Sequence, residues 1–189
     1  TVVGSALRNE LFVSPAGKDL VSINLMRGRD HGIPAYSEWR KYCALSKVNN
    51  LKRLQRVMDP GLAEEFDNIY GGGIRDMDLF SAGLAEYPIT DGLLGPTFSC
   101  IIARQFSQLK HGDRFWYERK DQPKPFTPAQ LSSIRQTGLA SILCKVTEGL
   151  NYNFQANPFY TTNIKGNYVM DCSNYHFMSL YPWKEAHIK

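Results

Sequence analysis

Several patterns that would assign a function directly are missing from this sequence. No run of 18 or more apolar residues occurs among the 189 residues, so no membrane-spanning helix is expected. The four cysteines form no C-x-x-C pair, and no histidine lies at zinc-finger spacing from them, which argues against a zinc or thioredoxin-like centre. The motifs G-x-S-x-G, H-E-x-x-H and G-K-[ST] are also absent. With 43% apolar residues, the chain is nevertheless too hydrophobic to be disordered.

Charge of either sign is modest. The formal net charge is +4 and the pI is about 8.8, well short of what nucleic-acid binding demands, and no nucleic-acid partner is expected. Residues 108–120 interleave basic and aromatic side chains, as single-strand binders do. The same stretch also contains acidic residues and follows a helix end. A packed aromatic turn with solvated charges is therefore the favoured interpretation.

The four cysteines are Cys43, Cys100, Cys144 and Cys172. They are structural disulfides or four buried thiols, and four cysteines allow three connectivities among which residue counting does not choose. If they pair in sequence order, each bridge stabilises the fold by roughly 3–4 kcal/mol. An even cysteine count without a metal pattern favours an oxidising, extracytoplasmic compartment.

Apolar periodicity and helix-capping signals predict a mostly α domain of short helices joined by long loops. Thr127-Pro128-Ala129-Gln130 has the form of a capping box with proline at the first helical position. Beyond Thr147, asparagine, proline, glycine and tyrosine are dense and irregular coil is expected to the end. The predicted helices cover residues 19–29, 34–43 (with Pro34 as its first residue), 50–58, 62–70, 96–109, 127–135 and 138–145.

The densest chemistry lies between residues 19 and 34. Asn24 and Arg27 are three residues apart, so both can project from one helix face toward one object. An amide beside a guanidinium can orient an imidazole and pair with a carboxylate. On residue types alone, a helix end fastened by an Arg29–Asp30–His31 network is the favoured alternative.

Two weaker features have structural explanations. Gly71–Gly73 follows a predicted helix and not a strand, so a C-terminal turn is favoured over a phosphate cradle. Asp76 and Asp78 lack further oxygen ligands at calcium-site spacing, so no metal site is expected there. Asp78 is interpreted as a helix cap or a loop anchor.

The block LVSINLMRGRDHGIPAY, residues 20–36, closely resembles the signature of animal-type haem peroxidases, the family of myeloperoxidase, thyroid peroxidase and peroxidasin. The resemblance continues through Trp39, Arg40 and Cys43 and returns in later blocks in the same order. These blocks are MDLFSAGLAE (77–86), GPTFSCIIARQF (95–106), GDRFWYE (112–118), SILC (141–144), Asp171-Cys172 and Trp183.

The resemblance implies the C-terminal portion of a mostly α peroxidase fold and a haem b that in many members is covalently attached. It implies reduction of hydrogen peroxide followed by oxidation of halide, thiocyanate, phenolic or protein-tyrosine donors, with a role in the response to oxidative stress. Asn24 matches the asparagine that accepts a hydrogen bond from the proximal histidine, and Arg27 matches the arginine that pairs with a haem propionate. The cysteines match two family disulfides, Cys43–Cys100 and Cys144–Cys172, which implies a secreted protein or the ectodomain side of a membrane protein.

The departures from the family pattern are equally specific. In the family, the distal histidine and arginine, the proximal histidine, the carboxylates that esterify haem and the calcium loop all precede the Asn-x-x-Arg segment. No histidine precedes Asn24 here; His31 matches a motif histidine that is not the iron ligand, and His111, His176 and His187 match no catalytic position. Residues 1–189 are therefore expected to be the C-terminal fragment of a single peroxidase domain, without catalytic residues or metal ligands of its own.

Two functions follow from this expectation. In the first, the segment is part of a haem peroxidase whose missing N-terminal part is its partner; the isolated fragment is inactive and exposes apolar faces that should cover the haem core. In the second, it is a catalytically inactive fragment that binds protein or matrix through its basic surface.

Overall fold

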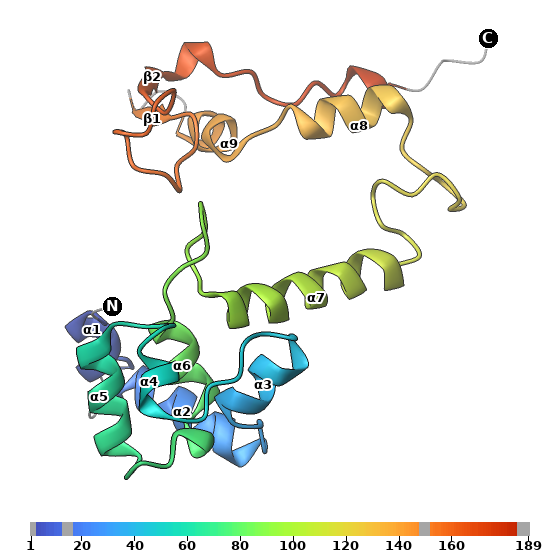
Figure 1. The fold of residues 1–189 in the computed structure, drawn as a ribbon. Coiled ribbons are helices and arrows are strands. Elements are labelled where there is room, and N and C mark those ends of the chain that lie inside the picture. The colour runs from blue at the N-terminus through green and yellow to red at the C-terminus, as the bar shows by residue number, and fades with distance from the viewer. Residues whose placement is uncertain (1–2, 13–16, 148–151, 185–189) are drawn as a thin grey trace. The chain divides into compact units, whose positions relative to one another are not determined.

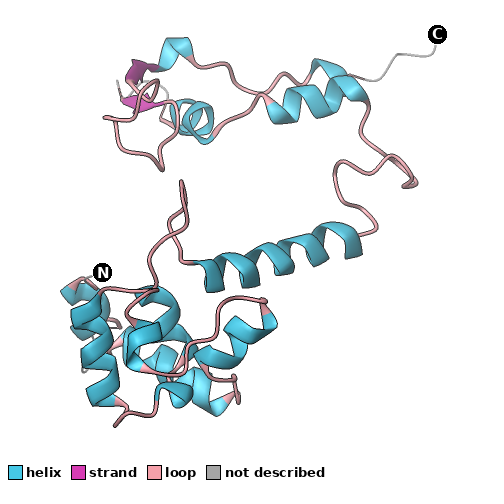
Figure 2. Cartoon of the chain, viewed as in Figure 1, coloured by secondary structure: helices cyan, strands magenta, loops and turns pink. Residues whose placement is uncertain are grey.

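Helices make up most of the regular structure in a computed structural model of the chain, which describes residues 3–12, 17–147 and 152–184 (Figures 1 and 2). The chain divides into two units, residues 1–110 and 111–189, and each is considered by itself. Within the described ranges, no helix is both long and apolar enough to cross a membrane. The expectations for residues 148–151 and for His187 lie outside the described residues.

The first unit is built almost entirely from helices. In chain order these are α1 (Ser5–Asn9), α2 (Leu20–Asp30), α3 (Tyr36–Tyr42), α4 (Leu51–Leu54), α5 (Pro60–Ile69), the 3₁₀ turn η1 (Ile74–Asp76), α6 (Leu79–Ala85) and α7 (Pro96–Gly112), whose last residues pass into the second unit. The helices α2, α5 and α7 lie where the sequence predicts them. The helices α1 and α6 were not predicted.

Side-chain caps set several of these helix starts. The Asp19 carboxylate accepts the Val21 N–H at 2.9 Å and opens α2. The Asp59 carboxylate caps α5, with Pro60 at its first position. Two predicted boundaries are wrong: α3 begins at Tyr36 and not at Pro34, and α4 spans only Leu51–Leu54 of the predicted 50–58. Backbone at Ala35 is extended, which delays α3.

A continuous apolar core lies within the first unit. Its largest members, Tyr36, Leu54, Met58 and Met77, are fully buried. The remaining core residues come from the loop before α4, from α5, η1 and α6, and they are Val48, Ala63, Phe66, Ile74 and Ala82. Because these residues belong to five short helices and the loops between them, the core and not local helix propensity holds the elements together.

The second unit has helices α8 (Pro128–Arg135) and α9 (Leu139–Val146), the short turns η2 (Cys172–Asn174) and η3 (Tyr181–Trp183), and a two-stranded sheet. Strands β1 (Asn153–Gln155) and β2 (Val169–Asp171), magenta in Figure 2, pair antiparallel. Phe154 lies opposite Met170. The expectation of irregular coil beyond residue 147 is therefore wrong for these strands. Each strand has three residues, too few for an alternating pattern to register in the sequence.

The capping box that opens α8 is confirmed in both directions. The Gln130 N–H donates to Thr127 Oγ1 at 3.3 Å, and the Thr127 N–H donates to Gln130 Oε1 at 2.8 Å. Just before α8, residues 113–121 form a turn in which Arg119 pairs with Asp121. Glu118 pairs with Arg135 of α8 at 2.5 Å. These paired charges and the neighbouring tilted aromatic rings agree with the packed aromatic turn.

The four cysteines form two disulfides, Cys43–Cys100 in the first unit and Cys144–Cys172 in the second, the pairing that the family resemblance implies. The first joins the end of α3 to α7, and the second joins α9 to η2.

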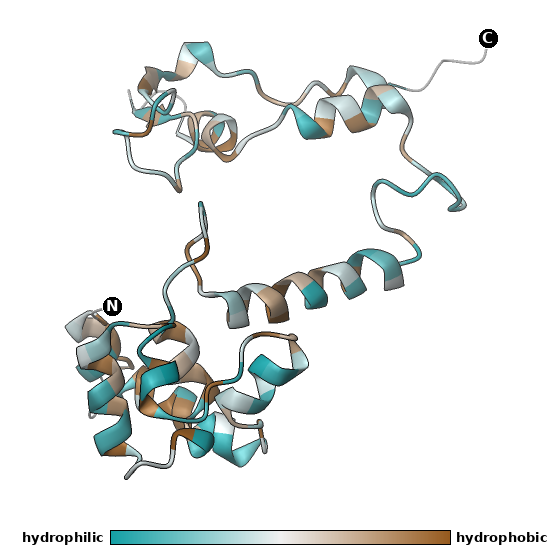
Figure 3. Ribbon diagram, in the orientation of Figure 1, coloured by the Kyte–Doolittle hydropathy of each residue, from teal (hydrophilic) through white to brown (hydrophobic). Residues whose placement is uncertain are grey.

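Helix α7 exposes much of its apolar surface. Apolar positions recur along it (Figure 3), yet Thr97 is its one buried residue within the described chain. Ile102, Phe106 and Leu109 are between 42% and 64% exposed. This agrees with the expectation that the chain has uncovered apolar faces.

Candidate functional site

One face of α2 and its C-terminal cap, His31, carry the four residues that define the candidate site. Asn24, Arg27, Gly28 and His31 follow one another at spacings of three, one and three, which places them on the same side of a helix. All four line one open pocket of about 500 Å³. Apolar side chains from α2, the turn after it, α6 and α7 form most of the remaining wall: Leu25, Ile33, Leu79, Phe80 and Phe98.

Asn24 and Arg27, the two predicted site residues, are thus brought to a single pocket. Asn24 is half-buried and Arg27 is exposed. Across the described ranges, neither side chain has a hydrogen bond or ion pair with another residue. An amide that can donate and accept, and a guanidinium with five N–H donors, therefore face an apolar-walled pocket with their hydrogen-bonding capacity unused.

Asp78, at the start of α6, forms the polar wall of this pocket. Arg29 donates to both of its carboxylate oxygens, from Nε at 3.0 Å and from Nη2 at 2.7 Å. The Tyr70 hydroxyl donates to Oδ2 at 2.6 Å. The Arg29 hydrogen bonds, supported by the one from Tyr70, hold the pKa of the Asp78 carboxyl below its ordinary value. Asp78 is thus a loop anchor: it occupies the capping position of α6, but its side chain makes no cap hydrogen bond.

The alternative network at the end of α2 is wrong for Arg29, which reaches across to Asp78 and not to Asp30. Its Asp30–His31 part is present as an exposed pair, with His31 Nε2 3.9 Å from Asp30 Oδ2. His31 also lines the pocket, a position that was not predicted for it. The spacing 24, 27, 28 and 31 was the signal that could have found it.

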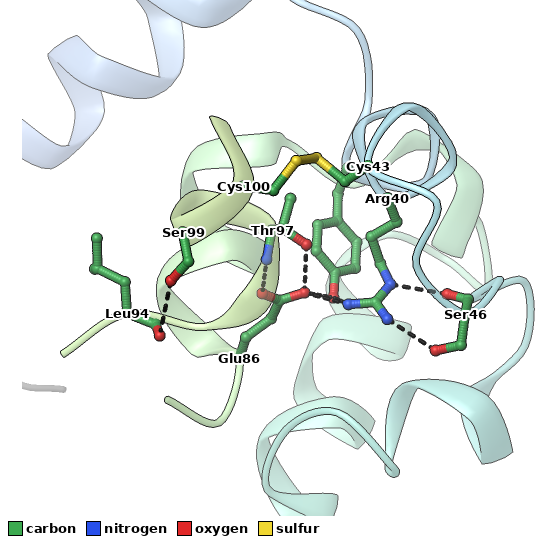
Figure 4. Close-up of polar contacts among 9 residues, drawn as sticks. Arg40, Cys43, Ser46, Glu86, Leu94, Thr97, Ser99 and Cys100 are labelled. Atoms are coloured by element: carbon green, nitrogen blue, oxygen red, sulfur yellow. Dashed lines mark hydrogen bonds and ion pairs between the residues drawn. A yellow bond between two sulfur atoms is a disulfide. The ribbon is translucent and has the colours of Figure 1, made fainter. Parts of the chain in front are cut away.

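A buried polar cluster fixes the start of α7 (Figure 4). The Glu86 side chain is fully buried and pairs with the almost fully buried Arg40. Thr97 donates to Glu86 from its N–H at 2.8 Å and from its hydroxyl at 2.6 Å. The Tyr36 hydroxyl also donates to Glu86, at 2.6 Å, and burial followed by this hydrogen bond raises the pKa of Tyr36. Glu86 therefore joins α3, the end of α6 and α7.

This cluster positions an aromatic wall of the pocket. Thr97, held by Glu86, precedes Phe98, which lines the pocket. Gly83 of α6 leaves room for the Phe98 ring, since a Cβ there would lie 2.6 Å from Phe98 Cε2. No local pattern predicted the Arg40–Glu86 pair, because its members are 46 residues apart.

The glycine run after α5 forms the predicted C-terminal turn. Gly71 and Gly72 adopt positive φ angles of 57° and 77° directly after α5, as a helix C-terminal turn requires. No group of three or more histidine, cysteine or acidic side chains that could hold a metal ion occurs among the described residues.

Comparisons with known proteins place the chain in a family. The family model for animal haem peroxidase matches residues 1–159. The chain is 37% identical to human peroxidasin homolog over 89% of its own length and 11% of the relative's, and 35% identical to mouse lactoperoxidase over 94% and 24%. Against Peroxidase-like protein 3 of Lottia gigantea, the identity is 37% over 87% of this chain and 53% of the relative.

A solved structure agrees with these matches. Peroxidase A from Dictyostelium discoideum superposes with a TM-score of 0.63 at 32% identity, over 87% of this chain and 29% of that one. The chain thus spans between about a tenth and about half of the length of the relatives it matches. The chain belongs to the animal haem peroxidase family.

Proposed function

We propose that this chain forms the proximal-side wall of the haem site in a peroxidase that reduces hydrogen peroxide and oxidises a halide, phenolic or protein-tyrosine donor. The observation that carries the proposal is that Asn24, Arg27, Gly28 and His31 line one apolar-walled pocket. Family membership supports a haem cofactor. When bound, haem supplies the iron that exchanges electrons with peroxide.

The lining of the pocket suits a porphyrin. A flat macrocycle with two carboxylates needs an apolar wall and a cation at one rim. Leu25, Ile33 and Phe98 provide apolar wall, and Arg27 provides a cation that no carboxylate of the described chain neutralises. Gly28 leaves the floor open, since a Cβ added there would meet nothing within 4 Å. These residues fit the group that the family name implies.

In this proposal, Asn24 is a positioning residue. Its amide oxygen would accept the ring N–H of the proximal histidine, contributed by polypeptide outside this chain, which would fix the tautomer of that ring and raise its basicity. Its half-buried place on α2 and its unused hydrogen-bonding capacity support this role.

Arg27 binds a haem propionate through its guanidinium. Two parallel N–H donors match a carboxylate, and the charge-assisted hydrogen bonds fix the rotation of the macrocycle. Asp78 does not compete for Arg27, because Arg29 and Tyr70 already occupy its oxygens. Because Arg29 neutralises the Asp78 carboxylate, that carboxylate repels a propionate in the pocket less strongly.

The proposal also concerns the surroundings of the chain. Polypeptide carrying the distal and proximal histidines, the haem-esterifying carboxylates and the calcium ligands completes the site, and it covers the apolar face of α7 at Ile102, Phe106 and Leu109. The isolated chain lacks turnover. Two disulfides support an oxidising compartment, so the protein is secreted or faces the outside of the cell.

The roles of Asn24 and Arg27 are tested in the whole peroxidase domain that contains this chain. Asn24→Ala is expected to lower turnover by roughly 10- to 100-fold and to shift the haem reduction potential and Soret band. Arg27→Gln is expected to weaken haem retention about tenfold or more. The matched controls are Asn68→Ala on α5 and Arg56→Gln after α4, which lie outside the pocket lining. Unchanged spectra and potential in Asn24→Ala would refute its role.

Binding of haem in this pocket is tested separately by placing a larger side chain at Gly28. Gly28→Leu places a side chain in open space without backbone strain, so it should fold normally and reduce haem content per domain severalfold. Gly112→Leu, at the end of α7, also meets open space and lies outside the pocket. Equal haem content in the two glycine variants would contradict the proposed binding position.

A further inference from the structure

The positive charge of this protein is concentrated in a single segment. Residues 39–58 contain six of the 22 lysines and arginines and no aspartate or glutamate, whereas acidic residues outnumber basic ones in the rest of the chain. Arg40 is neutralised inside the protein by Glu86. The other five, Lys41, Lys47, Lys52, Arg53 and Arg56, are exposed to solvent.

Folding arranges these cations around two adjoining hollows. The first, of about 510 Å³, is lined by Lys41, Lys47 and Arg75 together with polar and small apolar residues and a single acid, Glu38. The second, of about 310 Å³, is lined by Ser46, Lys47, Arg53 and Arg56. Lys47 belongs to both hollows, so they form one surface. We call the five cations that line it the cationic face: Lys41, Lys47, Arg53, Arg56 and Arg75.

Residues 39–58, which carry four of the five cations of the cationic face, are fixed at several points. The Cys43–Cys100 disulfide anchors their start. The Arg40 guanidinium donates to the Ser46 carbonyl at 2.9 Å and to its hydroxyl at 2.8 Å (Figure 4). Val48 is buried in the core. Arg53 donates to Asn49 at 3.2 Å and keeps further N–H donors free. Cations held in place lose less conformational freedom when an anion binds.

Little within the described chain neutralises this face. Lys41 lies 3.8 Å from Glu38, an exposed pair of small energetic value. Lys47, Arg56 and Arg75 have no ion pair with a described acidic residue. A surface with several unpaired cations attracts a ligand that carries a matching series of anions.

We propose that the cationic face binds a sulfated polysaccharide of the extracellular matrix type. Two adjoining hollows that share Lys47 can each take one anionic group of the same ligand, and a linear polyanion places its sulfates at regular intervals. Lysine and arginine both bind such tetrahedral oxyanions. The two disulfides indicate an oxidising compartment, where these polysaccharides occur and nucleic acids are rare. An acidic protein partner is disfavoured, because neither hollow is lined by an aromatic side chain that could act as an anchor.

The experiment measures binding of the purified chain to immobilised heparin as a function of NaCl concentration, so it does not depend on haem. The triple variant K47Q/R56Q/R75Q is expected to bind at least tenfold more weakly at 0.15 M NaCl. The slope of log affinity against log salt should fall by about two, as for other polyanions. The control K120Q/K165Q/K184Q makes the same change in net charge at exposed lysines elsewhere, and its affinity should change less than twofold.

A second measurement on the unmodified chain guards against misfolding of the variant. Acetylation of lysines, read by mass spectrometry, should show heparin protecting Lys41 and Lys47 but not Lys165 or Lys184. Equal weakening in both triple variants would overturn the proposal, because binding would then follow overall charge. Equally tight binding of poly-glutamate or of desulfated heparin would also overturn it, because the ligand would then not be recognised by its sulfates.

Discussion

The two units of this protein are stabilised in different ways. The first buries nine apolar core residues between Tyr36 and Ala82, together with the Arg40–Glu86 pair. In the second, the buried apolar side chains among the described residues are Ala140 and Cys144. That unit relies on the Cys144–Cys172 disulfide and on side-chain hydrogen bonds to its loops. A segment that cannot form a large core needs covalent and polar cross-links instead.

The largest expected effect is in the core of the first unit. Glu86→Gln leaves the Arg40 charge buried without a counter-charge, which should cost about 3–5 kcal/mol of unfolding free energy. Urea unfolding, monitored by hydrogen exchange in α3 and α6, measures the loss of unfolding free energy. The control Asp121→Asn, which breaks the exposed Arg119–Asp121 pair of the second unit, should leave the unfolding free energy nearly unchanged. A loss below about 1 kcal/mol in Glu86→Gln would show that the pair is not structural.

Removal of each disulfide sharpens the comparison between the units. Each bridge contributes about 3–4 kcal/mol on chain-entropy grounds, for sequence separations of 57 and 28 residues. With so few buried apolar residues, the second unit should lose its hydrogen-exchange protection in the Cys144→Ser/Cys172→Ser variant. The first unit should stay protected in Cys43→Ser/Cys100→Ser. Protection that survives in both variants would mean that the second unit has a sufficient core.

Asn167 tests the polar cross-links of the second unit. It is buried, accepts the Asn157 N–H at 2.7 Å, and donates to the carbonyls of Asn157, Tyr160 and Thr161 at 3.1–3.2 Å. Asn167→Ala leaves these groups unpaired and should cost about 1–3 kcal/mol, seen as faster proteolysis of the loop between β1 and β2. Asn163→Ala, an exposed position in the same loop, is the control and should leave the cleavage rate nearly unchanged.

The smallest effect is a pH dependence at Asp78. Its pKa in the folded protein is lowered by Arg29, so its stabilising contribution is present above the ordinary value of 3.8 and is lost as the pH falls through the folded pKa. As the pH is lowered from 5 to 2, the midpoint temperature of thermal unfolding should therefore fall more steeply in the unmodified protein than in Asp78→Asn. Parallel curves would mean that the ion pair contributes nothing to stability.

Local signals in the sequence predicted the helices better than the contacts between distant residues. The Thr127 capping box depends on residues within three positions of each other, and this helix start was predicted. The Asp59 cap is equally local, but the helix that it opens was predicted to begin only at residue 62. The β1–β2 pairing joins two three-residue strands, and Asn167 organises the loop between them. No periodic pattern of that length distinguishes such strands from coil.

The candidate site was predictable only in part for the same reason. The three-residue spacing of Asn24 and Arg27 predicted that both lie on one helix face, and the family resemblance implied their roles toward haem. The pairing of Arg29 with Asp78, 49 residues away, replaced the expected local network. A long guanidinium side chain reaches the partner that tertiary packing brings near, and sequence distance does not limit that choice.

The amino-acid sequence by itself determined the helix periodicity, the helix starts at Asp19, Asp59 and Thr127, and the amide–guanidinium pair on one helix face, because these depend on neighbours within one or two turns. Tertiary structure alone decided that Glu86 lies buried against Arg40 and that Arg75 joins the cations of residues 41–56 around a shared surface. Such contacts depend on loop closures over tens of residues, whose geometry the packing of the core sets.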